Sequence, residues 1–311
     1  MFAVSFIVYG ILYLTPSDPA RLMLGASAPE SALEQLRSEL GLDQPFLVQY
    51  FDYMKGVLQG DFGVSYRSQQ SVLLEISARL PVTVKLALSS IIVISVLGIL
   101  LGVISAVKQY SFIDKFLTVF SMCAAAVPSF WLGLMLMLLF SLNLGWLPSY
   151  GVTSGWKSYI MPVIALSLPS LAEIIRMTRS AMLDTIHQDY IRTARAKGMT
   201  ERKVILGQAL KNALLPIITV IGANFGSLLG GSVVIETVFA LPGLGNMVVS
   251  SIRTKDIPQV MAGTMIIALM FCIILLIMDV AYAFIDPRIR TSYIKIKKKS
   301  IFQKRMEARR S

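Results

Sequence analysis

Five long blocks of apolar residues and one shorter block limit what this chain can fold into. The long blocks cover about 82–106, 116–142, 159–177, 213–237 and 259–284, and the short one covers 1–14. A helix needs about 20 apolar residues to cross a hydrocarbon core of about 30 Å. In lipid, every backbone polar group must be paired inside its own segment, so these blocks should be helices. The sequence therefore predicts an all-α integral membrane protein with six transmembrane helices.

The first block, 1–14, is short for a span. A secretory signal peptide is the alternative, since Ala26-Ser27-Ala28 resembles a cleavage site. That alternative lacks a basic region before the apolar stretch, and its cleavage site lies too far beyond that stretch. We therefore expect 1–14 to be a first transmembrane helix, from a chain whose usual cytoplasmic start lies ahead of Met1.

The basic residues are distributed unevenly between the two sets of loops. Two of the 29 Lys and Arg residues lie in 107–115, eight in 176–212 and ten after residue 285. The opposite loops together hold eight. Because basic loops stay in the cytoplasm, the bias places the C-terminus there and an extracytoplasmic segment at 15–81. The core then covers 82–290, with a large cytoplasmic loop at 178–212.

A basic tail follows at 291–311, and it contains Lys297-Lys298-Lys299. Contact with anionic lipid headgroups is its expected physical role. Nucleic-acid binding is the weaker alternative, because the tail is short, is tethered to a membrane and has few aromatic residues.

Small and charged residues inside the blocks suggest where helices meet. Gly222, Gly226 and Gly230 form a stripe on the fifth block, which suits close helix packing within the chain or a close interface with a partner or gate. Glu173 and Arg176, three residues apart, are predicted to pair. Glu236 is a candidate pathway or gate residue, because a charge within a span needs a partner or water.

Motifs for catalysis are missing from the sequence. It contains no GxxxxGK[ST] phosphate loop and no HExxH, and its single histidine, His187, lies in a polar loop. Cys123 and Cys272 lie inside apolar blocks and have no CxxC partner, which argues against a zinc site or a disulfide framework. We expect a chain that is not an enzyme and that has no cofactor or metal of its own. Transport powered by another subunit fits this pattern.

The cytoplasmic loop carries the most specific pattern. It contains Asp189, Tyr190, Ile191, Arg192, Thr193, Ala194, Arg195, Ala196, Lys197 and Gly198. Alanine and arginine favour a short helix here, and Gly198 is a suitable C-terminal stop. Ala194 and Ala196 would let another protein approach closely, and the basic residues would offer charge contacts. A solvated basic loop is the alternative that the residues alone leave open.

This loop resembles the coupling loop of the membrane-spanning permease subunits of ABC importers. The usual E-A-A, three residues and glycine is represented by Ala194 and Gly198, whereas Arg192 and Thr193 replace the first two letters. These departures resemble the dipeptide/oligopeptide/nickel branch, where D-Y-x-R-T-A-R-A-K-G is typical. Further segments that resemble this branch are Leu40–Pro45, Gly60–Gly63, Glu236–Gly245 and Asp286–Arg290.

The resemblance implies a type I importer permease fold in a bacterial cell membrane. It implies a second, related permease subunit, two cytoplasmic ATPases that engage residues 189–198, and an extracytoplasmic binding protein that faces 15–81. Di- or oligopeptides are the expected solutes; nickel, metal–metallophore complexes and glutathione are alternatives within the same machinery. A secondary carrier and a membrane scaffold without transport are the alternatives from other classes.

Overall fold

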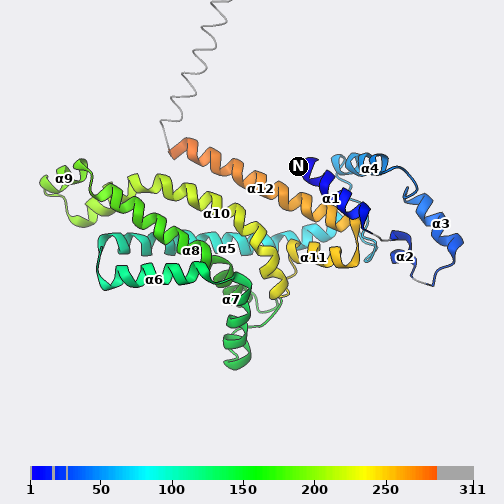
Figure 1. Cartoon of the computed structure of the whole chain (residues 1–311), viewed down its shortest axis with the longest axis horizontal. Coiled ribbons are helices and arrows are strands. Elements are labelled where there is room, and N and C mark those ends of the chain that lie inside the picture. Colours follow the sequence, from blue (N-terminus) through cyan, green and yellow to red (C-terminus); the bar gives the residue numbers. More distant parts are fainter. Residues whose placement is uncertain (1, 16–17, 26, 286–311) are drawn as a thin grey trace, which may run out of the picture.

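A computed structural model describes residues 2–15, 18–25 and 27–285 of the chain, and within them it is almost entirely helical. The molecule is elongated, with helices α2 and α3 at one end and α9 at the other (Figure 1). A single isolated bridge pairs Val64 with Ser71 within the described ranges. The segment 286–290 and the tail 291–311 lie outside what the structure describes.

Among the described residues, four helices are long and apolar enough to cross a membrane. They are α5 (Val72–Val107), α8 (Lys157–Ile186), α10 (Leu210–Val238) with the π-helical turn η2 (Lys203–Ala209) before it, and α12 (Ile257–Ile285). A shorter apolar helix, α1 (Phe2–Leu14), corresponds to the first predicted span. The predicted helices are present, but α5 begins ten residues before the expected 82 and α8 ends nine residues after the expected 177. Both extensions mix apolar residues with charged ones, Glu75 and Arg79 in the first and Arg179 and Asp184 in the second, which end the purely apolar blocks.

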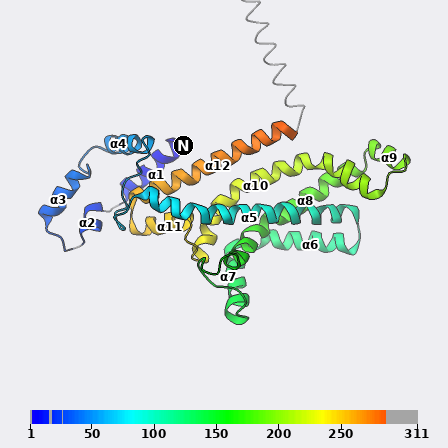
Figure 2. The same cartoon turned by 180° about the vertical axis from the view of Figure 1, so that it is seen from behind.

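The predicted span at 116–142 is not one straight helix. It forms α6 (Phe112–Ala126) and then α7 (Ser129–Leu136) with the π-helical η1 (Met137–Asn143), and the two halves meet at 100°. Val127 is extended, with ψ of 122°. Pro128 follows it, and a proline disfavours helical backbone at the residue before it. The second half therefore leaves the direction of α6, as the view from behind also shows (Figure 2).

Helix α8 lies at the centre of the bundle and packs against α5, α6, α7 and α10. Two glycines of α5 allow the close approach of α8. A Cβ on Gly98 would lie 2.6 Å from Cγ2 of Ile174, and a Cβ on Gly102 would overlap the side chain of Thr178. The backbones of the two helices can approach this closely only because neither glycine carries a side chain.

The predicted glycine stripe of α10 divides between two environments. A Cβ on Gly222 would lie 2.5 Å from Cε of Met278, and one on Gly226 would overlap Phe271, so both glycines pack against α12. A Cβ on Gly230 would meet nothing within 4 Å, and Gly230 is exposed. Packing within the chain therefore explains the first two glycines and leaves the third unexplained.

The segment between α1 and α5 folds into α2 (Pro19–Leu24), α3 (Glu30–Glu39) and α4 (Phe46–Leu58). Helix α4 packs on α1, where the hydroxyl oxygens of Ser5 and Tyr50 lie 2.9 Å apart. The loop before α5 is fixed to the start of α12, because Ser65 Oγ donates to Oδ2 of the buried Asp256 at 2.5 Å. These contacts hold the segment against one end of the bundle.

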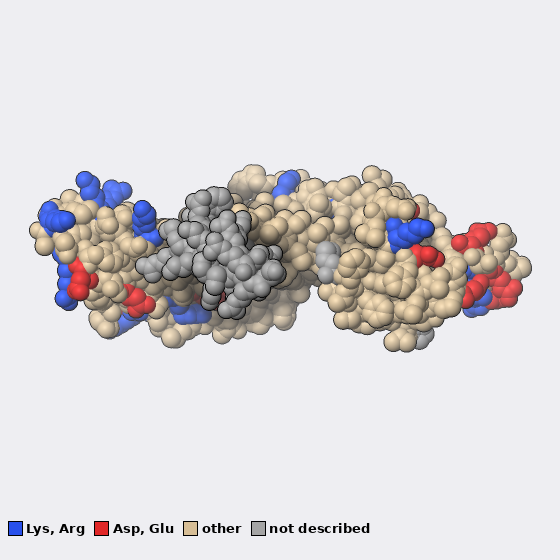
Figure 3. All heavy atoms as spheres, turned by 90° about the horizontal axis from the view of Figure 1, so that it is seen from above, with Lys and Arg blue, Asp and Glu red and all other residues tan. Residues whose placement is uncertain are grey.

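Charge is separated along the long axis of the molecule. Lys and Arg gather at the end that carries α9, and Asp and Glu gather at the end that carries α3 (Figure 3). The exposed basic residues on and next to α9 are Arg192, Arg195, Lys197, Arg202, Lys203 and Lys211. The exposed acidic residues at the second end are Glu30, Glu34, Glu39 and Asp43.

Candidate functional site

The predicted short helix is present as α9 (Asp189–Ala196), between α8 and η2. Gln188 precedes it with extended backbone, Asp189 lies in its first turn and Arg195 in its last. These charges suit the helix dipole, which favours an acid at the N-terminus and a base at the C-terminus. Only Ile191 and Ala194 of this helix are buried. Helix α9 therefore rests one narrow face on the bundle and presents the rest outward.

The structure places Ala194 on the inner face of α9. The residue is 9% exposed and belongs to the main hydrophobic core, and its expected role in letting another protein approach stays a prediction. Its small size suits packing against the bundle, where Val204 and Ala209 of η2 are also buried. Ala196, by contrast, is exposed. A larger residue at 194 would first disturb the seating of α9.

Gly198 ends the helix as the sequence predicts. Its φ is +76°, a left-handed conformation that costs an ordinary L-residue about 1–2 kcal/mol. Its N–H donates to the carbonyl of Arg195 at 2.9 Å, and the N–H of Met199 donates to that of Ala194 at 3.3 Å. A Cβ at Gly198 would meet nothing within 4 Å. Glycine is therefore favoured at position 198 by the left-handed backbone conformation, and not because neighbouring atoms leave no room for a side chain.

The outward face of α9 is polar and largely free of strong internal pairing. Arg195 Nε donates to Oε1 of Glu201 at 2.8 Å, which bends that guanidinium back toward η2. Arg192 lies 3.9 Å from the carboxylate of Asp189, and both side chains are more than three-quarters exposed. An exposed pair of this kind contributes little to stability. Arg192, Thr193 and Lys197 therefore project into solvent.

A side-chain hydrogen bond joins α9 to the base of α10. Asn212 Nδ2 donates to Tyr190 Oη at 3.0 Å and to the carbonyl of Gln208 at 3.0 Å. The ring of Tyr190 is 41% exposed. Beside this contact lies a shallow hollow of about 600 Å³, lined by Met199, Arg202, Lys203, Leu206, Gly207 and Gln208. The α9 surface and this hollow together form the candidate site.

A partly buried ion pair braces the bundle beside the turn between α5 and α6, and sequence reasoning missed it. Arg179 of α8 donates from Nε to Oδ1 of Asp114 at 2.6 Å and from Nη2 to Oδ2 at 2.8 Å. Ser105 Oγ and the N–H of Tyr110 complete the acceptor sites of Asp114 at 2.6 and 2.9 Å. This geometry ties α5, α6 and α8 together. Arg179 was counted only as a cytoplasmic charge, since its partner lies 65 residues away.

The predicted pair of Glu173 and Arg176 is wrong. Arg176 Nη1 donates to the carbonyl of Ser121 on α6 at 3.1 Å. Glu173 Oε2 instead accepts from Asn224 Nδ2 on α10 at 3.0 Å. Successive turns of α8 face different neighbours, so the two side chains bind across the bundle rather than along the helix.

Glu236 is fully buried near the end of α10. Thr83 Oγ1 donates to its Oε1 at 2.7 Å, and the N–H of Asn246 donates to its Oε2 at 3.0 Å. Asn246 lies in the first turn of α11 (Leu244–Thr254). The carboxylate therefore caps α11 and joins it to α5 and α10. The structure shows this bracing position, and the pathway or gate role expected of Glu236 stays a prediction.

Comparison with known proteins identifies the family. Residues 98–291 match the family described as "Binding-protein-dependent transport system inner membrane component", and residues 1–87 match its N-terminal companion family. The glutathione transport system permease protein GsiC of Escherichia coli (strain K12) is 40% identical over 290 residues, which cover 93% of this chain and 94% of that protein. The GsiC of Salmonella typhimurium (strain LT2) is 41% identical over 287 residues, 92% of this chain and 94% of the relative.

Solved structures show the same fold at low sequence identity. An inward-facing structure of the MetNI methionine ABC transporter matches with a TM-score of 0.57 and 17% identity, over 69% of this chain and 97% of that chain. An amino acid ABC transporter solved with histidines matches with a TM-score of 0.52 and 17% identity, over 67% and 92%. With both family matches, these likenesses lead to one conclusion: the chain belongs to the binding-protein-dependent transport system inner membrane components, the permease subunits of ABC importers.

Proposed function

We propose that this chain and a second, related permease form the pathway of an ATP-driven importer. Two separate cytoplasmic ATPase subunits supply the energy, and an extracytoplasmic binding protein delivers the solute. The chain itself hydrolyses no ATP, because its sequence contains no phosphate loop. It is a multi-pass protein of the cell membrane, with its C-terminus and α9 on the cytoplasmic side.

Helix α9 is the contact for the ATPase. The observation that carries this assignment is the division of the helix into a seated inner face, Ile191 and Ala194, and a free outer face. A helix held in this way moves together with the bundle when a partner binds it. The hydrogen bond from Asn212 to Tyr190 supports this coupled movement of α9 and the bundle, because it links α9 directly to α10. ATP binding and solute binding then bias one two-state arrangement of helices.

A mid-span carboxylate supports a pathway or a subunit interface on the α8–α10 side. Glu173 lies about halfway along α8, and it is exposed although Asn224 donates to it. A charge facing lipid at the bilayer centre costs at least about 2.5–3.5 kcal/mol on insertion scales. This side of the bundle is therefore suited to face water or a partner subunit, not lipid.

The solute is a small peptide. The GsiC proteins that resemble this chain are named for glutathione transport, and glutathione is a tripeptide. Nickel and metal chelates are less favoured, since the GsiC names point to neither. Uptake of labelled glutathione and dipeptides by the assembled transporter distinguishes these solutes.

Reconstituted vesicles that hold the full transporter test the ATPase contact. Gly198→Val should reduce ATP-driven uptake at least about fivefold, because a β-branched residue at φ of +76° costs the turn at least about 1–2 kcal/mol. Gly198→Asn is the matched control, since asparagine tolerates left-handed backbone and should keep most of the uptake. Membrane insertion should be unchanged in both variants, as read from the yield of folded protein.

Two results would overturn the proposal. One is full uptake and full ATPase co-purification in Gly198→Val. The other is uptake driven by an ion gradient in vesicles that lack ATPase subunits, which would indicate a secondary carrier.

A further inference from the structure

A carboxylate in the middle of the bundle is not explained by packing within the chain. Glu173 lies about halfway along α8, and its side chain is exposed on the subunit. The buried Asn224 of α10 donates from Nδ2 to Glu173 Oε2 at 3.0 Å. Within the described residues, Glu173 forms no other hydrogen bond and no ion pair. Its second oxygen, Oε1, therefore remains available as an acceptor.

The cations that follow on α8 do not neutralise this carboxylate. Arg176 lies three residues later, but its Nη1 donates to the carbonyl of Ser121 on α6 at 3.1 Å. Arg179, one turn further along, binds Asp114 through both carboxylate oxygens. A charge at the bilayer centre costs at least about 2.5–3.5 kcal/mol when it faces lipid. The carboxylate therefore needs water or a cation that comes from outside this subunit.

The side of α10 beside Glu173 consists of small residues. Thr219, Ala223 and Ser227 are exposed and follow one another at intervals of four, so they lie on one face of the helix. Ser227 is less than one turn from Asn224, the residue that binds Glu173. The face lies between the contacts of α10 with α8 and with α12. Thr219, Ala223, Ser227 and Glu173 together are called the Glu173 surface.

The Glu173 surface differs from the outer side of α5. There, the exposed residues at the same spacing are Leu88, Ile92 and Val96, whose large apolar side chains suit hydrocarbon. The face from Thr219 to Ser227 instead covers about 12 Å of helix without a large side chain. An extended tripeptide covers at most about 11 Å. The surface therefore has the length and the open space that a small peptide requires.

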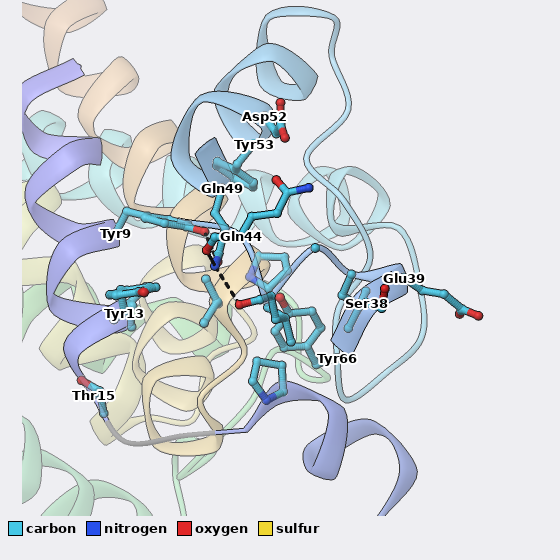
Figure 4. Close-up of a pocket in the computed structure, with 17 residues that line it drawn as sticks. Tyr9, Tyr13, Thr15, Ser38, Glu39, Gln44, Gln49, Asp52, Tyr53 and Tyr66 are labelled. Carbon is cyan, nitrogen blue, oxygen red and sulfur yellow. Dashed lines mark hydrogen bonds between the residues drawn. The ribbon is translucent and has the colours of Figure 1, made fainter. Parts of the chain in front are cut away.

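A cavity of about 520 Å³ between α1, α4 and the start of α12 is less suited to a charged solute (Figure 4). Gln49 there donates from Nε2 to two backbone carbonyls of the turn between α3 and α4, and its Oε1 accepts from Tyr9. Glu39 points away from the cavity and accepts from Nε2 of Gln35 at 2.9 Å. These polar groups bind one another, whereas the Glu173 carboxylate keeps an oxygen without a partner in the described structure.

We propose that Glu173 is a specificity-determining residue of the pathway and binds the ammonium group of the solute. Asn224 holds Oε2 and orients the carboxylate, and Oε1 accepts an ammonium proton. The inference rests on the proposed function for the existence of the pathway and for a small peptide as its solute. A lysine or arginine of the second permease is the competing cation. The open face along α10 favours the solute, because it continues over two turns and is not confined to the carboxylate.

Cysteine labelling in the assembled transporter tests whether the Glu173 surface faces water. Cys123 and Cys272 are first replaced by serine. Ser227→Cys should then react with a water-soluble maleimide at least about tenfold faster than Ile92→Cys on α5, because a thiol in apolar surroundings rarely ionises. Added L-alanyl-L-alanine should slow the labelling of Ser227→Cys a few fold. Equal labelling rates for the two variants would overturn the placement of this surface in the pathway.

Equilibrium dialysis tests the recognition of the ammonium group. The assembled transporter in lipid nanodiscs, without nucleotide and without the binding protein, is offered L-alanyl-L-alanine or N-propionyl-L-alanine, which has the same shape without the amino group. The wild type should bind the dipeptide at least about tenfold more tightly, as a charge-assisted hydrogen bond predicts. Glu173→Gln should bind both compounds equally, whereas Glu173→Asp keeps the charge and should keep the preference. Asp184→Asn removes an exposed acid near the end of α8 and is the matched control, with the preference unchanged.

Several outcomes would overturn the inference. They are a preference that persists in Glu173→Gln, an equal loss of preference in Asp184→Asn, and a wild type that binds neither compound. If the wild type shows no preference and Glu173→Gln no longer co-purifies with the second permease, the carboxylate pairs with a cation of that subunit instead. ATP-driven uptake is measured separately in vesicles. A wild type that shows the preference without ATP-driven uptake would refute the proposed function alone, and ATP-driven uptake without the preference would refute the role of Glu173 alone.

Discussion

At Glu236, one buried carboxylate holds three helices. Its two oxygens accept from Thr83 on α5 and from the backbone of Asn246 at the start of α11, and Glu236 itself belongs to α10. Gly243 allows this approach, because a Cβ at that position would overlap the carboxylate. A carboxylate that accepts hydrogen bonds from a helix N-terminus also meets the positive end of the helix dipole. The residue is therefore a brace for the turn between α10 and α11.

Replacing Glu236 should lower the free energy of unfolding, and the loss should be larger when the new side chain keeps fewer oxygen acceptors for Thr83 and Asn246. Glu236→Leu leaves the hydroxyl of Thr83 and the N–H of Asn246 without their acceptor, at a cost of about 1–3 kcal/mol for each buried group. Glu236→Gln keeps one acceptor oxygen and should cost less. Thermal unfolding in detergent measures the order, with Glu201→Gln as an exposed control. A Tm for Glu236→Leu equal to that of the control would contradict the bracing role.

At the scale of elements, glycines set how closely the helices pack. Gly98 and Gly102 of α5 lie under α8, and Gly222 and Gly226 of α10 lie under α12. Gly230, on the same helix, has free space instead. Glycine thus allows close helix packing within the chain at four positions, whereas at Gly230 it leaves an exposed surface on α10.

Two leucine substitutions separate these environments. Gly102→Leu forces a side chain into Thr178 and should destabilise the subunit by about 1–3 kcal/mol, as overpacking does. Gly230→Leu should leave the Tm of the isolated subunit unchanged and reduce co-purification of the second permease. Thermal unfolding gives the Tm of each variant, and size-exclusion chromatography of the co-expressed subunits shows whether the second permease co-purifies. Normal assembly of Gly230→Leu would show that the second permease does not contact this surface.

The α2–α3 unit buries Ala20 and Leu33 and also carries a network of ion pairs. Arg37 binds Asp18 at 2.5 Å and Glu30 at 3.0 Å, and only Leu33 of α3 is buried. The hydrogen bond from Arg37 lowers the pKa of Asp18 below its ordinary value. A lowered pKa means that the contribution of Asp18 to stability is complete above the ordinary pKa of about 3.9 and is lost as pH falls through the folded value.

Amide hydrogen exchange measures this dependence. Residues 18–39 of the wild type should be protected at neutral pH and should lose protection as the pH falls below about 4, after correction for the intrinsic exchange rate. Arg37→Met should show weak protection already at neutral pH. Unchanged protection in Arg37→Met would mean that the network does not hold the unit.

At the scale of the whole molecule, the local sequence predicted most helices, but it did not predict which side chains distant in sequence bind one another. The apolar blocks, the short helix at 189–196 and its stop at Gly198 were readable, because each depends on neighbouring residues. The bend at Pro128 was not predicted, since a proline inside an apolar block is compatible with either a kink or a boundary. Asp114 with Arg179 and Ser65 with Asp256 were missed, because hydropathy and spacing carry no information about partners 65 and 191 residues apart.

The charge separation along the molecule predicts its orientation. A cysteine introduced at Arg195 should react with a membrane-impermeant maleimide only from the cytoplasmic side, and one at Glu34 only from outside. The natural Cys123 and Cys272 are exposed on the subunit and must first be replaced by serine. Labelling of position 195 in intact cells would contradict both the orientation and the ATPase contact.

The unbroken run of η2 and α10 has a mechanical consequence. Its 36 residues form a rod of roughly 54 Å, longer than the hydrocarbon core is thick. A rigid rod of this length that pivots about its middle through about 10° moves each end by about 5 Å, a distance comparable to one helical turn. Tyr190 is tied near one end and Glu236 is buried near the other. If the rod moves as a rigid body, a displacement at the basic end of the subunit should therefore be matched by one of similar size at the turn before α11, at the other end of the rod.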